Sequence, residues 1–183
     1  MNAPVKQGPT HAPIGDTGAS VFSMRGAPLL SEGASYDGLA SAENLWLSLK
    51  VYSSGGENAF HTHTTEDHAF VVMQGKGTFH FTRGEGQEVT SKEVTLFEGV
   101  MIPKGVAYRF EADEAQNLVL LRIGAAQRTT EGVIDVDTKR GVPPEMKGKT
   151  FDLDGSHKDG RAAKTGTPSR PIVPIPGRYF PER

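Results

Sequence analysis

Three of the six histidines in this chain, His61, His63 and His68, fall within eight residues. Alternate side chains of an extended strand share one face, so His61 and His63 can direct both imidazoles at a single metal ion. His68 begins an apolar run over residues 69–73 that predicts the returning strand of a hairpin, and so a third imidazole at the same place. Because cysteine is absent, a transition metal here would be held by nitrogen and oxygen ligands.

The segments around these histidines have the alternating pattern of half-buried strands. In residues 44–52, leucine or valine occupies every second position, a period of two. Because no helical stripe competes with this pattern, we expect an all-β fold, an antiparallel sandwich or barrel. Turns are predicted over residues 31–35 and 53–58. Further strands are predicted over residues 20–30, 78–83, 88–97, 99–103, 107–111 and 117–123.

We expect three parts in the chain. Residues 1–20 are rich in glycine, proline and threonine without periodicity, which predicts a flexible N-terminal arm. Residues 21–125 form the predicted barrel domain. Residues 126–183 form a proline- and glycine-rich basic extension that wraps the barrel or stays mobile. The sequence PIVPIPGRYF near its end is more apolar, and predicts a docked strand or a polyproline-like segment.

Charge and hydropathy indicate which partners and which location to expect for this protein. A formal net charge of −2 gives no reason to expect nucleic-acid or membrane partners. No window approaches the roughly 18 apolar residues that span a bilayer, and the first residues lack the pattern of a signal peptide, so we expect a cytoplasmic protein. Residues 138–183 carry ten Lys/Arg against five Asp/Glu. This basic tail either docks on an acidic barrel, its own or a partner's, or is solvated.

The spacing of glycine and histidine resembles the first motif of the cupin superfamily. That motif runs glycine, five residues, His-x-His, three or four residues, glutamate, six residues, glycine. Gly55, His61, His63 and Gly75 fall on the pattern, and counting back from Gly75 places His68 where the glutamate is expected. With the shorter gap, Asp67 would take that position instead of His68.

A later stretch is similar in part to the second cupin motif. Pro103 and Gly105 agree with it, and Gly105 is expected in a turn that needs positive φ. At three other positions the chain departs from the motif: Phe97, Tyr108 and Ala112 stand where it has glycine, histidine and asparagine.

The resemblance covers about residues 40–124 and implies a jelly-roll-like antiparallel β-barrel with one divalent transition metal ion per chain. It implies His61, His63 and His68 as ligands, with Tyr108 either as a fourth ligand or as a pocket acid that donates a hydrogen bond. Iron is the favoured metal, with manganese, nickel, copper and zinc as alternatives. Cupin barrels commonly pair, which implies a homodimer.

Three neutral imidazoles leave a divalent ion with its full charge, which favours an anionic chelating substrate such as an enolate, carboxylate or catecholate. The resemblance then implies a non-haem iron dioxygenase acting on a small anionic or enolisable substrate, with Tyr108 as its catalytic residue. One alternative is a metal-dependent lyase or isomerase. Another, from a different class, is a non-catalytic cupin that binds a small ligand.

Strand parity places three apolar side chains, Phe70, Val72 and Phe110, beside the metal ligands as walls of a substrate pocket. His80 is a further candidate for this pocket, and its alternative is an ordinary strand residue. Glu66 and Asp67 are interpreted as turn residues.

Overall fold

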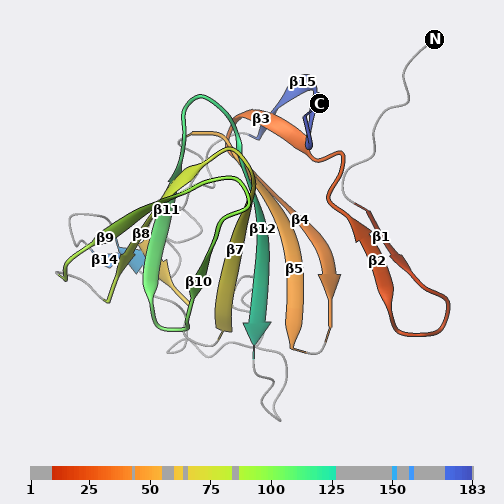
Figure 1. Ribbon diagram of the computed structural model, residues 1–183, viewed down its shortest axis with the longest axis horizontal. Coiled ribbons are helices and arrows are strands. Elements are labelled where there is room, and N and C mark those ends of the chain that lie inside the picture. Colours follow the sequence, from red (N-terminus) through yellow and green to blue (C-terminus); the bar gives the residue numbers. More distant parts are fainter. Residues whose placement is uncertain are drawn as a thin grey trace.

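A computed structural model describes residues 10–42, 44–54, 60–63, 66–83, 87–126, 150–151, 157–158 and 172–182. Every element in this part of the chain is a β-strand (Figure 1). In chain order the strands are β1 (Thr10–Pro13), β2 (Ser20–Ser23), β3 (Pro28–Glu32), β4 (Ala34–Ser41), β5 (Leu45–Tyr52), β6 (Phe60–Thr62), β7 (Glu66–Gln74), β8 (Gly77–Thr82), β9 (Thr90–Val94), β10 (Gly99–Ile102), β11 (Ala107–Ala112), β12 (Leu118–Ala126), β13 (Thr150–Phe151), β14 (His157–Lys158) and β15 (Val173–Tyr179).

Two antiparallel sheets face each other across the interior (Figure 1). One has the strand order β10-β7-β12-β5-β4, and the other has the order β14-β13-β6-β11-β8-β9. The sheets are not joined edge to edge, so the predicted barrel is a jelly-roll-like sandwich that is not fully closed. Two short ribbons, β1-β2 and β15-β3, lie outside these sheets. The predicted all-β antiparallel class is therefore confirmed.

The predicted hairpin between the histidine-bearing strands is wrong. β6 pairs with β11 and β13, whereas β7 pairs with β10 and β12 in the other sheet. Both edges of β7 are thus occupied, and the chain crosses from one sheet to the other between β6 and β7. The imidazole of His68 nevertheless lies close to those of His61 and His63, as expected, because the two sheets face each other.

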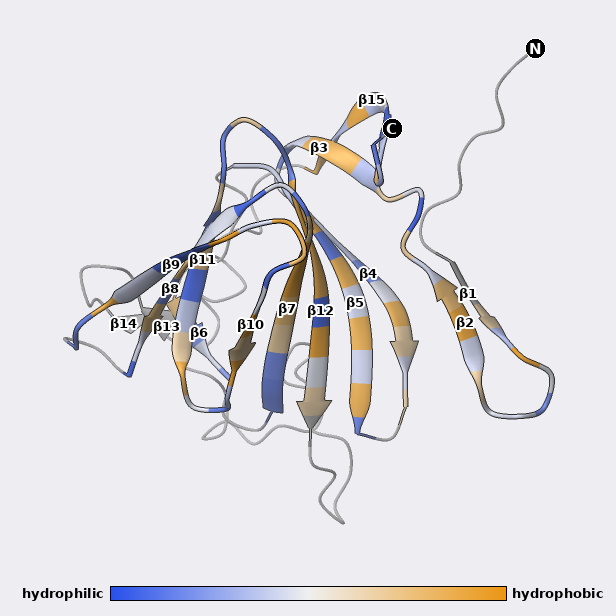
Figure 2. Ribbon diagram, in the orientation of Figure 1, coloured by the Kyte–Doolittle hydropathy of each residue, from blue (hydrophilic) through white to orange (hydrophobic). Residues whose placement is uncertain are grey.

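The main core fills the space between the sheets. Side chains on alternate positions of β7, β8, β11 and β12 point into it, among them Phe70, Val72, Phe79, Phe110 and Leu120, each 3% exposed or less. Figure 2 shows hydrophobic colouring along β7 and β12 and its alternation with polar residues along β5. These buried strands hold the walls around the candidate site in place.

A second core lies on the outer face of β5 and β12. Leu49 and Val51 pack there against Leu29 and Leu30 of β3, and Phe180 after β15 completes the cluster. The side chain of Asn117 accepts a hydrogen bond from the Leu30 N–H at 2.5 Å and donates one to the Leu30 carbonyl at 2.8 Å. β3 and β15 therefore cover this face, and the predicted docked strand near the C-terminus is confirmed.

Several boundaries differ from those expected. The first predicted strand is divided into β2 and β3, and the predicted turn at residues 31–35 contracts to Gly33, with φ of 84°, before the unpredicted strand β4. β1 lies inside the residues predicted as a flexible arm. Gly55 and most of the 53–58 turn fall outside the described residues, and the three-part division of the chain stays a prediction. Within the described part, no helix that could span a bilayer occurs.

Candidate metal centre

β6 and β11 place His61 beside Tyr108. The two residues are paired in register, and their rings are 4.4 Å apart. The His63 ring is 5.1 Å from the His61 ring. Gly105, at φ of 86°, donates its backbone N–H to the His63 carbonyl at 2.8 Å. The predicted turn at Gly105 is confirmed, and it holds the segment that carries His63.

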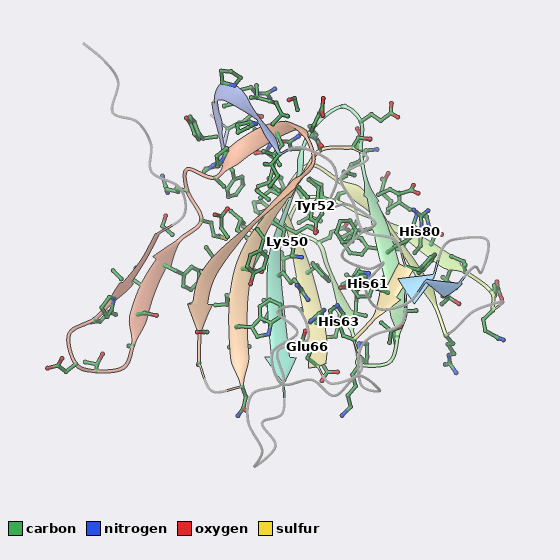
Figure 3. The ribbon with its side chains drawn as sticks, turned by 180° about the vertical axis from the view of Figure 1, so that it is seen from behind. Lys50, Tyr52, His61, His63, Glu66 and His80 are labelled. Atoms are coloured by element: carbon green, nitrogen blue, oxygen red, sulfur yellow. The ribbon has the colours of Figure 1, made fainter. Side chains whose placement is uncertain are left out.

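β7 supplies a carboxylate and an imidazole from the same face. Glu66 and His68 are two residues apart on the strand, and both are buried. The Glu66 Oε1 atom lies 2.7 Å from Nε2 of His68 and 3.3 Å from Nδ1 of His63. Donor atoms of His63, Glu66 and His68 all lie within 4.8 Å of one another. Figure 3 shows His61, His63 and Glu66 gathered between the sheets.

Glu66 is the site residue that sequence reasoning missed, because it was interpreted as part of a turn. The structure instead starts β7 at Glu66, with the side chain 3% exposed. The signal was present in the sequence: the two-residue spacing that pairs His61 with His63 also pairs Glu66 with His68. Placing the strand start three residues too late, at Ala69, hid this second pair.

Asp67, the alternative ligand on the shorter motif gap, belongs to the other face of β7. Its carboxylate accepts the backbone N–H of Lys104 at 2.8 Å, which ties β7 to the turn at Gly105. The group of three close donors contains Glu66 rather than Asp67. Alternation along the strand is the physical reason, because neighbouring residues point to opposite faces.

Arg122 of β12 lies over the face of the His68 imidazole. Its Nη2 atom is 3.0 Å from Nε2 and 3.3 Å from Nδ1 of His68. An atom at those distances within the ring plane would collide with the carbon between the two nitrogens, so Nη2 lies above the ring. In the ring plane, His68 faces Glu66 at Nε2 and the Tyr108 hydroxyl, 3.3 Å away, at Nδ1.

Trp46, the single tryptophan of the chain, forms another wall of the group. Its Nε1–H donates to Oε2 of Glu66 at 3.1 Å, and the guanidinium of Arg122 lies 4.5 Å from its ring centroid. Trp46, Gly124 and His68 follow one another across β5, β12 and β7. A Cβ atom at Gly124 would lie 2.0 Å from Cε2 of Trp46. The indole therefore reaches Glu66 by lying over a position that has no side chain.

The charges around Glu66 favour its ionised form. Burial alone would raise the pKa of the Glu66 carboxyl, but hydrogen bonds and positive charge from His63 and His68 outweigh it and lower that pKa to about 2. Nη2 of Arg122 is a further cationic group, 3.8 Å from Oε1 of Glu66. The carboxylate is thus available as an anionic ligand at neutral pH.

The three apolar side chains that were predicted to lie beside the metal ligands are buried in the core that contains Tyr108. The Phe70 ring lies 5.7 Å from the Tyr108 ring and 5.9 Å from the Phe110 ring, and Val72 is fully buried in the same core. Their role as pocket walls stays a prediction.

His80 lies outside the group around Tyr108. On β8 it pairs with Arg109, and its Nδ1 is hydrogen-bonded to the Ser91 hydroxyl at 2.7 Å. It alternates with Phe79 and Phe81 and so points away from the interior, apart from the labelled site residues in Figure 3.

Comparison with known proteins agrees with this architecture. The family model described as Cupin matches residues 38–159. The chain belongs to the cupin family. A comparison with curated proteins found no match.

Solved cupin-like structures are similar to this chain at low identity. KdgF from Halomonas sp. is 17% identical, with 52% of this chain and 81% of that chain covered and a TM-score of 0.46. The Cnp3 cupin domain of Schizosaccharomyces pombe is 14% identical, with coverages of 66% and 89% and a TM-score of 0.49. CapF, solved with the inhibitor 3-isopropenyl-tropolone, is 17% identical, with coverages of 69% and 34% and a TM-score of 0.53. The likeness to CapF, at 17% identity, shows the fold alone.

The donor set of this cupin fits a divalent transition metal. Two imidazoles and one carboxylate, buried and close together, are ligands that iron and related ions accept. His63, Glu66 and His68 would hold the ion, with His61 and Tyr108 next to them. The predicted set of His61, His63 and His68 stays a prediction, and the structure adds the Glu66 carboxylate as a further candidate ligand beside it.

Proposed function

We propose that this cupin is a metal-dependent enzyme, a non-haem iron dioxygenase acting on a small anionic or enolisable substrate that binds the metal directly. The observation that carries the proposal is the buried group of His63, Glu66 and His68. Two histidines and one carboxylate with open positions are the ligand pattern of non-haem iron oxygenases. A ferrous ion held there would supply oxygen activation and Lewis acidity.

The chain's own residues have distinct roles in this proposal. His63, Glu66 and His68 bind the ion, and His61 is available as a fourth ligand. Tyr108, only 1% exposed, keeps its hydroxyl beside His68 and can donate a hydrogen bond to a bound substrate. The apolar walls around these residues exclude water, which strengthens the polar interactions inside.

Metal content tests the proposal directly. Glu66→Gln and His68→Ala should each lose stoichiometric metal, because each removes one donor of the group. The matched controls are Asp67→Asn, whose amide oxygen can still accept the Lys104 N–H, and His80→Ala, on the other face of β8. Both controls should retain metal. Metal-free wild-type protein after reconstitution with Fe(II), or equal loss in the controls, would contradict the proposal.

Oxygen dependence separates the dioxygenase from a lyase or isomerase. Turnover of a candidate substrate by the iron-loaded protein should stop without O₂ if the protein is a dioxygenase, and should continue if the ion acts only as a Lewis acid.

A non-catalytic cupin is favoured by one observation, the presence of Tyr108 where the second cupin motif has a histidine ligand. Metal-loaded protein that binds a small acid without consuming it, in air, would support this second candidate.

A further inference from the structure

Ser48 and Arg122 form a polar pair inside an otherwise largely apolar wall. They are direct partners across β5 and β12, two residues along from the row of Trp46, Gly124 and His68 and therefore in the next row on the same face. Ser48 is 0% exposed and Arg122 is 1% exposed. Side chains directly opposite in an antiparallel pair are neighbours on the same face, so the Ser48 hydroxyl and the guanidinium lie on the site's side of the sheet.

The Ser48 hydroxyl has no hydrogen-bond partner among the described residues. Burying a hydroxyl without a partner costs free energy, and alanine would fill the same position in a strand without this cost. A hydroxyl on the same face of the sheet as Arg122, directly opposite it across the strand pair, is suited to contact a molecule bound at the guanidinium.

The charges of the site call for an anion once a metal is present. Without metal, Glu66 compensates Arg122 at a distance of 3.8 Å. A divalent ion bound to Glu66 would use that negative charge, and the ion, Glu66 and Arg122 together would be net positive in a buried place.

We infer that Arg122 and Ser48 form a binding site for the carboxylate of a small 2-oxo or 2-hydroxy acid, next to the metal position. This inference rests on the proposed metal site. Nη2 of Arg122 is 3.0 Å from Nε2 of His68, a donor of the metal group, so one carboxylate can contact both the ion and the guanidinium. A bound ion would supply a position for the neighbouring oxo or hydroxy oxygen of the acid, and the Ser48 hydroxyl would donate to the carboxylate.

Ligand binding to cobalt-loaded protein tests the inference without an activity assay. The probes are pyruvate, which offers a carboxylate and an oxo group, and imidazole, a neutral metal ligand that offers nothing to a guanidinium. Binding is measured by calorimetry and by the fluorescence of Trp46, the single tryptophan, whose ring centroid is 5.6 Å from that of His68. Arg122→Met should weaken pyruvate binding by roughly 10- to 100-fold, with imidazole binding changed by no more than about twofold.

Ser48→Ala provides a milder variant that does not risk the fold. It should weaken pyruvate binding by about 2- to 10-fold. In the metal-free protein it should unfold at the same temperature as wild type or a higher one, because it removes a buried hydroxyl that has no described partner. A structural role for this hydroxyl predicts the opposite sign.

The outcomes separate the two proposals. If cobalt does not bind to wild type, the metal site itself is wrong and the inference falls with it. If cobalt binds but wild type does not bind pyruvate, or Arg122→Met binds pyruvate as wild type does, the carboxylate site is wrong and the metal site stands. Equal weakening of pyruvate and imidazole would show that Arg122 only supports the metal ligands, which also overturns the carboxylate site.

Discussion

At the scale of single residues, His68 contacts three other residues of the site, Glu66, Tyr108 and Arg122. It takes the motif position of a carboxylate, and the carboxylate is supplied two residues earlier by Glu66. Its Nδ1 faces the Tyr108 hydroxyl at 3.3 Å, while Arg122 covers its ring. A metal-binding histidine whose other nitrogen has a fixed partner is held in one tautomer and one orientation. Tyr108 is well placed to orient His68.

Tyr108→Phe tests this orienting role. Removing the hydroxyl should lower metal affinity by roughly 10- to 100-fold, less than the loss in His68→Ala, because the ligand remains but its partner is gone. Titration of cobalt against Trp46 fluorescence measures the change. A phenolate charge-transfer band in iron(III)-loaded wild type that disappears in the variant would instead identify Tyr108 as a direct ligand.

At the scale of elements, the residues that lie directly opposite one another on neighbouring strands determine which side chains contact the site. Trp46 on β5 reaches Glu66 on β7 only because Gly124 lies between them on β12. A side chain at Gly124 would meet carbon atoms of the indole ring at 2.0 and 2.1 Å. Gly124 is therefore required for the packing of Trp46 in the site, and not for the backbone conformation of the strand.

Gly124→Ala should displace the indole of Trp46 and break its hydrogen bond to Glu66. The expected cost is about 1–3 kcal/mol of unfolding free energy, together with a changed fluorescence maximum, because the added methyl group overfills a packed position. Gly38→Ala on β4 is the matched control, since its Cβ would meet nothing within 4 Å. Equal effects in the two variants would contradict this explanation. Chemical denaturation and emission spectra provide the measurements.

At the scale of the whole molecule, the site depends on two cores on opposite faces of one sheet. The inner core adjoins the candidate metal group through Phe70 and Tyr108, and the outer core lies under β3 and β15. The outer core contains Phe180, 6% exposed, and residues after β15 thus contribute to stability from outside the site.

Phe180→Ala should destabilise the protein by about 3–5 kcal/mol, the usual cost of emptying a buried aromatic position. Ile172→Ala is the control from the same segment, because Ile172 is 57% exposed and should change stability by less than about 0.5 kcal/mol. Cobalt affinity below the unfolding transition should be unchanged in both variants. A large loss of affinity in Phe180→Ala would show that the two cores are coupled.

The predicted homodimer also belongs to this scale and stays a prediction. β10 is an edge strand of its sheet, and Met101 on it is 70% exposed, which is suited to strand-to-strand pairing. Light scattering on the protein should give twice the chain mass. A monomer at micromolar concentration would contradict it.

The sequence by itself determined the features that follow from local periodicity. Alternating side chains predicted the strands and placed His61 and His63 together, and a glycine in Pro-Lys-Gly predicted the turn at Gly105. These predictions succeed because a strand's two faces and a positive φ depend on a few neighbouring residues. The same alternation of side chains also pairs Glu66 with His68, but the predicted strand began at Ala69 and so did not include them.

Only the tertiary structure decided which strands lie side by side. It placed β6 and β7 in different sheets, although the short connection between them predicts a hairpin. It also brought Trp46 and Arg122 to His68 from strands distant in the sequence. Nothing in a single strand indicates its neighbours, because pairing depends on burying the apolar faces of all strands at once. For that reason a cluster of histidines was visible in the sequence, whereas the charge balance around it was not.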